Sequence, residues 1–354
     1  MDEFARISYW TDHRARAEDE KLRGVVHGIG DDAAVLDISR APEDVIGDKQ
    51  LVASVDTMVE QIHFNERTMR DEDVGYKAVA ACVSDIAAMG GVPLYALISI
   101  SVPSTYSADR IHKLYNGIYD CANRYELSIV GGDTTSAPEH LVLSVTVIGA
   151  VEAGAALLRS SAQAGHAVFV TGLLGKSAAG LHALSSGRIE KNIAEQQYLF
   201  SLAEAHQRPS PSVAAGRILL QAQRSSGGAL NDISDGLTSE AWEIAEASGV
   251  RIVLEEEQLV CSDELIAYAK ELQQDPLQWI LYGGEDYMLV GTMNREQIDH
   301  VAESFRQAGL PFYIIGFVEA GEPEVELLTS RMKQAQAGQR RIKLAKRGYN
   351  HFNG

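Results

Sequence analysis

Aspartates recur beside serine, threonine or glycine near the ends of predicted strands. In the segment LVASVDTM, the two-residue period of a strand places Ser54 and Asp56 on the same face. In ALNDISDG, Asp232 and Ser234 have the same spacing, and Asp235 follows at the start of a predicted helix. Carboxylate and hydroxyl oxygens are ligands that Mg²⁺ prefers, and phosphate oxygens commonly complete its coordination. The pattern therefore indicates magnesium-dependent chemistry on a phosphorylated ligand.

Two further aspartate segments contain glycine turns. In SIVGGDTTS, Gly131 and Gly132 allow the backbone to approach a ligand closely, and Asp133 projects beside them. In HGIGDDAAV, Asp31 and Asp32 follow a glycine turn and face opposite ways if the chain is extended. We therefore expect only one of these two carboxylates to enter the site.

Asp85 is the most informative of the acidic residues. It lies in a helix predicted over 75–90, among apolar neighbours that include Val83 and Ile86. A carboxylate in such surroundings is costly to desolvate unless a cation lies close. The other aspartates also have structural explanations, as turn residues, strand ends or helix N-caps. Their recurrence in several segments favours a shared metal site, and no His/Cys cluster suggests zinc.

Two nucleotide-binding motifs are only approximated. GIGDDA (28–33) has Ala33 where a dinucleotide-binding fingerprint needs its third glycine. TGLLGKSAAG (171–180) resembles a P-loop, but the required spacing would place the first glycine at Val170. We expect Lys176 and Ser177 to form an ordinary strand-to-helix turn.

The composition limits the class of protein. The 354 residues include 31 Lys and Arg against 49 Asp and Glu, a formal net charge of −18. This balance argues against nucleic-acid binding, which requires a basic surface. The start of the sequence does not resemble a signal peptide, and no apolar run is long enough to span a membrane. The three cysteines are widely separated, so we expect a cytoplasmic protein without disulfides.

Strands and helices alternate along the whole chain, which predicts an α/β or α+β fold. The length favours two domains, and the segment 152–166, rich in Ala, Gly and Ser, is the best candidate for their boundary. We assign residues 1–152 to the first domain and 153–354 to the second. A charged helix is predicted over 1–23. Further helices are predicted over 109–125, 177–184, 237–248 and 295–309, and strands over 51–58, 96–103, 127–136, 141–152, 167–172, 229–236 and 312–320.

At these residues the sequence resembles the thiamine-monophosphate kinase family, within the superfamily of aminoimidazole ribonucleotide synthetase. The matching blocks stay in order and cover nearly the whole chain. They are GIGDDAAVL (28–36), SVDTMVEQIHF (54–64), YKAVAACVSDIAAMGGVP (76–93), VGGDTTS (130–136), RSSAQAGHAVFVTG (159–172), RPSPSV (208–213), NDISDGL (231–237), YGGEDYML (282–289), IGFV (315–318) and RGYNHF (347–352).

The resemblance implies a first domain that dimerises through its sheet and a second domain that closes over the site. It implies direct in-line transfer of a phosphoryl group from ATP to thiamine monophosphate, with several Mg²⁺ ions. The implied metal ligands are Asp32, Ser54, Asp56, Asp85, Asp133, Asp232 and Asp235. The implied ATP contacts are Tyr115, Gly132, Asp133, Arg159 and Ser234, and the implied contacts to thiamine monophosphate are His63, Glu285 and Tyr349.

Two positions depart from the family pattern: Val55 replaces a common threonine, and Gln61 stands where a small residue is usual. Two alternative functions remain. Another enzyme of the superfamily would keep ATP and Mg²⁺ but use a different acceptor, and a non-catalytic protein would only bind nucleotide. The retained aspartates argue against the second alternative.

Overall fold

The computed structural model describes residues 24–27, 35–36, 48–189, 197–223, 227–330 and 340–349. The predicted helix over 1–23 and both Asp31 and Asp32 lie outside these ranges. The chain forms two compact units, which are described one at a time. Unit 1 comprises residues 1–86 and 91–154, and unit 2 comprises residues 87–90 and 155–354.

A four-stranded sheet forms the centre of unit 1. Its strands are β3 (Lys49–Val59), β4 (Val92–Pro103), β5 (Ser128–Ala137) and β6 (Val142–Glu152), in the order β3-β6-β4-β5. Strands β4 and β5 are parallel, and the other two pairs are antiparallel. The short strands β1 (Val25–His27) and β2 (Val35–Leu36) pair with each other.

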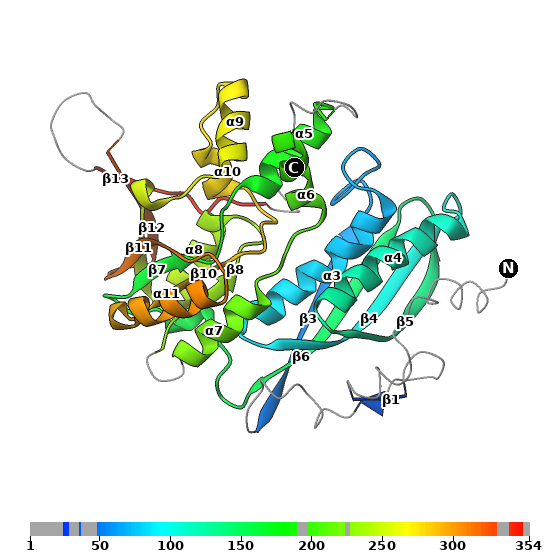
Figure 1. The fold of residues 1–354 in the computed structure, drawn as a ribbon, viewed down its shortest axis with the longest axis horizontal. Helices are drawn as coiled ribbons and strands as arrows, with labels where there is room; N and C mark the ends of the chain where they lie inside the picture. Colours follow the sequence, from blue (N-terminus) through cyan, green and yellow to red (C-terminus); the bar gives the residue numbers. More distant parts are fainter. Residues whose placement is uncertain are drawn as a thin grey trace. The chain divides into compact units, whose positions relative to one another are not determined.

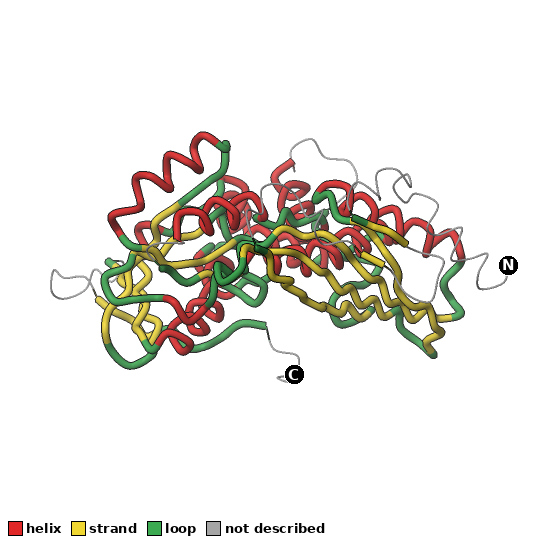
Figure 2. Tube along the Cα trace, turned by 90° about the horizontal axis from the view of Figure 1, so that it is seen from below, coloured by secondary structure: helices red, strands yellow, loops and turns green. Residues whose placement is uncertain are grey.

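Two helices, α3 (Asp71–Ala88) and α4 (Ala108–Arg124), run side by side on one face of this sheet (Figures 1 and 2). Their close approach depends on glycine, because a Cβ atom on Gly75 would overlap the carbonyl oxygen of Leu114. A Cβ atom on Gly117 would likewise overlap the carbonyl oxygen of Glu72. The two helices thus bury the apolar residues of one sheet face and fix the position of Asp85 above β3.

Unit 2 contains a seven-stranded mixed sheet in the order β13-β12-β9-β11-β7-β10-β8, in which only the pair of β9 and β12 is parallel. Helix α8 packs on this sheet, and α5, α6, α9 and α10 pack together beyond it (Figure 1). The strands are β7 (Ala167–Val170), β8 (Leu230–Asp232), β9 (Val250–Glu255), β10 (Leu289–Met293), β11 (Tyr313–Ala320), β12 (Glu324–Thr329) and β13 (Arg340–Lys343). The helices are α5 (Lys176–Ser185), α6 (Gln197–Gln207), α7 (Val213–Gln223), α8 (Leu237–Ser248), α9 (Asp263–Leu272), α10 (Leu277–Tyr282) and α11 (Ile298–Gln307).

The predicted α/β class is confirmed, and helix α8 has the predicted bounds. Strand β8 is shorter than predicted and ends at Asp232, so the strand period does not extend to Ser234. Within the described ranges, no helix is long and apolar enough to cross a membrane.

Candidate functional site

In unit 1, the predicted ligands Ser54 and Asp85 meet. The hydroxyl group of Ser54 on β3 donates a hydrogen bond to the Asp85 carboxylate on α3. Ser54 and Asp56 are both partly buried, whereas Val55 between them is exposed, as the predicted strand alternation requires. Strand β3 and helix α3 therefore present a hydroxyl group and two carboxylates to the same side of the sheet.

Cys82 lies beside these carboxylates. Its thiol is buried and donates to the carbonyl oxygen of Val145, at an S···O distance of 3.1 Å. Burial raises the pKa of the Cys82 thiol well above its usual range, and the negative charges of Asp56 and Asp85 raise it further. The effect on the thiol shows that both carboxylates face the same small region between β3 and α3.

Asp133 lies elsewhere in unit 1. It is exposed on β5, the edge strand opposite β3. The register across the sheet pairs Asp133 with Ser99, Ser99 with Ser144, and Ser144 with Thr57. Paired residues face the same side of a sheet, so Asp133 lies on the same open face as Thr57. Asp56 is the neighbour of Thr57 on β3 and therefore lies on the helix face. Within one chain, the structure does not bring these two predicted ligands together.

Gly132 is also required by the packing of the sheet. Its φ is +157°, and an added Cβ would overlap the carbonyl oxygen of Ile98 on the neighbouring strand. The close approach is therefore between strands β4 and β5, whatever ligand binds nearby.

His63 lies in a tight turn that ends β3. The backbone N–H group of Val59 donates to Nδ1 of His63 at 2.9 Å, so Nδ1 carries no proton and a neutral ring is protonated at Nε2. Gln61 has a left-handed φ of +68°, a backbone conformation that glycine adopts without strain and other residues adopt uncommonly. Tyr115 is buried in α4 with 5% of its surface exposed, and burial raises its pKa.

In unit 2, three segments that are distant in sequence lie against one another. The backbone N–H of Glu285 donates to the carbonyl oxygen of Ser234 at 2.7 Å, and the N–H of Tyr287 donates to that of Ile233 at 3.0 Å. The N–H of Tyr349 donates to the carbonyl oxygen of Asp235 at 3.3 Å. Four predicted site residues, Ser234, Asp235, Glu285 and Tyr349, are therefore brought together by backbone hydrogen bonds.

Glu240 on α8 connects the residues around the end of β8 through its carboxyl group. Its sequence position within a predicted helix did not identify it as a site residue. Its carboxyl group accepts hydrogen bonds from the side chain of Asn231 at 2.5 Å and from the backbone N–H of Asp235 at 3.1 Å. Burial, together with the negative charges of Glu243 and Asp232, raises the pKa of Glu240 to about 9. The carboxyl groups of Glu240, Glu243 and Asp232 therefore lie close together near the end of β8, and this group of residues is called the acidic corner.

Arg159 is held beside the same group. Its Nε atom donates to the side-chain oxygen of Asn231 at 2.9 Å, and its Nη1 atom lies 2.9 Å from Glu243. About half of the Arg159 side chain remains exposed. A planar guanidinium group fixed in this way is suited to phosphate oxygens.

The P-loop-like segment at the start of α5 is capped by a carboxylate of the protein itself. The backbone N–H groups of Gly175 and Ser177 donate to the two oxygens of Asp286, at 2.6 and 3.1 Å. These are the donors that a phosphate group would otherwise use at a helix N-terminus. The segment is a turn between β7 and α5, as predicted, and its capping by Asp286 was not foreseen.

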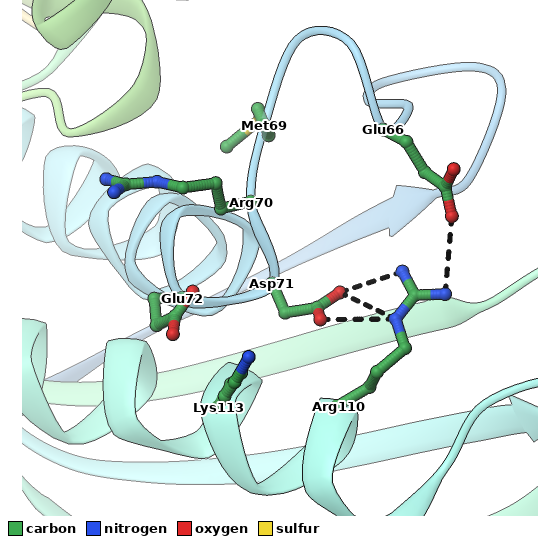
Figure 3. A pocket seen from close by; sticks show the side chains of 7 residues that line it. All are labelled: Glu66, Met69, Arg70, Asp71, Glu72, Arg110 and Lys113. Atoms are coloured by element: carbon green, nitrogen blue, oxygen red, sulfur yellow. Dashed lines mark hydrogen bonds and ion pairs between the residues drawn. The ribbon is translucent and has the colours of Figure 1, made fainter.

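A separate pocket of about 490 Å³ lies between the start of α3 and α4 (Figure 3). Arg110 spans it, with Nη2 at 2.9 Å from Asp71 and Nη1 at 3.4 Å from Glu66. None of the predicted site residues lines this pocket. Its charged groups neutralise one another, so it does not form part of the acidic site.

The acidic groups suit a metal ion that a phosphorylated ligand helps to hold. Among the described residues, no three His, Cys, Asp or Glu side chains are arranged to hold a metal ion by themselves. Mg²⁺ commonly takes only one or two carboxylates, keeps water molecules, and binds phosphate oxygens. Ser54 with Asp56 and Asp85 provides such a donor set, and so do Asp232 and Asp235.

The chain matches two family models. The model described as AIR synthase related protein, N-terminal domain, matches residues 30–151, and the corresponding C-terminal domain model matches residues 163–327. The chain is 40% identical to the thiamine-monophosphate kinase of Bacillus subtilis (strain 168) over 92% of this chain and 93% of that protein.

Solved structures agree with the family matches. A thiamine-monophosphate kinase from Stenotrophomonas maltophilia K279a is similar with a TM-score of 0.75 and 33% identity, over 91% of this chain and 94% of that chain. A second structure, described as AaThiL complexed with AMPPCP and TMP, is similar with a TM-score of 0.70 and 31% identity, over 83% and 87% of the two chains.

The Asp286 cap predicts a pH-dependent stability. Burial raises the pKa of Asp286 in the folded protein to about 7, although two amide hydrogen bonds lower it. An unfolded aspartate titrates near pH 3.9, so the folded state binds more protons between about pH 4 and about pH 7. The contribution of Asp286 to the free energy of unfolding is therefore fully present below this window. It decreases by up to about 1.4 kcal/mol per pH unit as pH rises through the window.

We expect the free energy of unfolding of the wild type, minus that of Asp286→Asn, to decrease by roughly 2 kcal/mol between about pH 5 and about pH 7. Urea denaturation at each pH measures this difference. Glu240 titrates in both proteins and cancels from the comparison. The exposed Asp299→Asn, measured in the same way, is the control for a general effect of removing a carboxylate. A difference for Asp286→Asn that does not change with pH would contradict the interpretation.

Proposed function

The chain belongs to the AIR synthase related family and, within it, to the thiamine-monophosphate kinases, and we propose that it transfers the γ-phosphoryl group of ATP to thiamine monophosphate. The products are ADP and thiamine diphosphate. The observation that carries the proposal is the hydrogen bond of Ser54 to the Asp85 carboxylate, on the same sheet face as Asp56. Such a donor set is suited to a nucleotide-bound Mg²⁺ ion.

We assign metal binding to side chains of both units. The bound Mg²⁺ ions would neutralise phosphate charge, which an acidic chain with a net charge of −18 does not do well by itself. The role of Asp32 rests on the family resemblance alone, because this residue lies outside the described ranges. The proposed ligands are Asp32, Ser54, Asp56, Asp85, Asp133, Asp232 and Asp235.

The geometry of unit 2 and the family resemblance support the proposed nucleotide contacts. Arg159 is fixed by Asn231 and Glu243 with half of its side chain exposed, so its remaining N–H groups are available to phosphate oxygens. Ser234 lies beyond the end of β8, where its hydroxyl group donates to Glu240 at 3.4 Å. The same assignment includes Gly132 and Asp133. It also includes Tyr115, although its burial leaves little surface for a nucleotide within unit 1.

We propose that His63, Glu285 and Tyr349 bind thiamine monophosphate. A carboxylate such as Glu285 complements the cationic ring of thiamine, and the exposed Tyr349 offers an aromatic surface for it. The substrate phosphate is already ionised, so it attacks without a general base. The transfer is direct and in line, so no phosphoenzyme forms. The protein therefore contributes alignment and charge neutralisation, which are the main requirements of phosphoryl transfer.

We also propose that the protein is a cytoplasmic homodimer that associates through the sheet of unit 1. Leu51 and Val55 are 55% and 62% exposed on the sheet face opposite α3 and α4, and among the described residues no helix covers that face. Large exposed apolar side chains on one face are typical of an interface. The three cysteines form no disulfide, which fits a reducing compartment.

A direct assay tests the proposed reaction. Purified protein with ATP, Mg²⁺ and thiamine monophosphate should form thiamine diphosphate, detected by chromatography. Asp85→Asn should lower kcat by at least about a hundredfold, because a metal ligand is lost where charge is neutralised. Asp299→Asn, an exposed substitution in unit 2, should leave the rate unchanged. No product from the wild type would reject the proposed function, and a fully active Asp85→Asn would reject the metal role.

The oligomeric state tests the proposed interface. Leu51→Glu should shift the protein from dimer to monomer in light scattering coupled to gel filtration, because a charge would be buried at the sheet face. Ile266→Glu is the matched control, since Ile266 is similarly exposed but lies in unit 2. A wild-type monomer, or a dimer unaffected by Leu51→Glu, would contradict the proposal.

A further inference from the structure

Glu285 and Asp286 are consecutive carboxylates whose side chains have different surroundings. Asp286 is buried against the start of α5, whereas the Glu285 side chain is 29% exposed. Glu285 has a φ of +65° and Tyr287 a φ of +51°, both in the left-handed region that non-glycine residues rarely adopt. Such conformations persist when the surroundings fix them, and they cluster at ligand-binding sites.

His206, in the last turn of α6, faces Glu285. Its Nδ1 atom lies 3.4 Å from Oε2 of Glu285 and 3.2 Å from the hydroxyl oxygen of Ser177. The histidine is completely buried. Ser177 is itself held in place, because its backbone N–H donates to Asp286. A buried ring with a fixed neighbour therefore supports a partly exposed carboxylate.

The arrangement of Ser177, His206 and Glu285 is not that of a hydrolytic triad. Both partners contact the same ring nitrogen, whereas a triad uses opposite nitrogens to relay a proton. Ser177 is also completely buried, so its hydroxyl group has no access to a substrate. The contacts instead fix the orientation of one carboxylate.

We propose that His206 is a positioning residue that holds the Glu285 carboxylate in the orientation that recognises the cationic heterocycle of thiamine monophosphate. This inference rests on the proposed function. A glutamate has several side-chain rotamers, and fixing one of them before binding avoids an entropic cost when the substrate arrives. His206 thus affects the binding of thiamine monophosphate and not that of ATP, whose proposed contacts lie on other residues.

Three substitutions separate positioning from general packing. His206→Asn places an amide nitrogen where Nδ1 lies, His206→Gln places one a bond further out, and His206→Phe keeps the ring without any hydrogen-bonding atom. The KM for thiamine monophosphate, the KM for ATP and kcat are measured for each. Thermal unfolding shows whether each variant is folded. Calorimetric titration with thiamine monophosphate measures the affinity of each protein for this substrate.

We expect His206→Phe to raise the KM for thiamine monophosphate by about tenfold, the effect of losing one polar contact to a charged group, with little change in the KM for ATP. His206→Asn should recover most of the affinity, and His206→Gln should not. If the Phe variant does not fold, the difference between Asn and Gln decides the question.

An equal rise in both KM values, or Asn no better than Gln, would overturn the inference while leaving the kinase function intact. A wild type that forms no thiamine diphosphate would instead reject the proposed function. The calorimetric affinities for thiamine monophosphate would then decide the role of His206 separately.

Discussion

The energetic cost of burying carboxylates governs the arrangement of this protein. Asp232, Glu240 and Asp286 are each almost completely buried. An ionised carboxylate removed from water is costly unless hydrogen bonds or a cation compensate. Asp286 accepts from two helix amides and Glu240 from Asn231 and Asp235, yet burial still raises both pKa values. These hydrogen bonds therefore offset only part of the desolvation cost of the two carboxylates. A bound cation would favour the ionised form of the carboxyl groups around Glu240. The acidic corner is therefore suited to a metal ion that also binds phosphate.

Backbone contacts, more than side chains, bring the distant segments of unit 2 together. A Cβ atom on Gly284 would overlap the carbonyl oxygen of Ser234, and one on Gly348 would lie 2.6 Å from that of Asp235. Glycine at these two positions lets the loop before β10 and the C-terminal segment lie directly against the loop after β8. The side chains proposed to bind nucleotide and substrate are then positioned by main-chain hydrogen bonds, which depend little on the ligand.

The sequence was most informative where a regular period or a local motif determines the structure. The two-residue period placed Ser54 and Asp56 on one face correctly, because β3 is a long regular strand. Local patterns do not reveal partners that come from distant helices, so Glu240 and His206 were not identified. The face of Asp133 depends on strand order and register across the sheet, which the sequence alone does not specify. The sequence did not reveal that Gly132 also permits the close approach of β4 and β5, because that contact depends on strand order.

The central claim is that carboxylates held by the fold bind a nucleotide through Mg²⁺. Calorimetric titration with a non-hydrolysable ATP analogue, in Mg²⁺ and in EDTA, tests this claim without requiring catalysis. The account predicts binding that is at least about tenfold tighter in Mg²⁺, and Asp85→Asn should remove most of that difference while leaving the affinity in EDTA unchanged. Equal affinity of the wild type with and without Mg²⁺ would contradict the account.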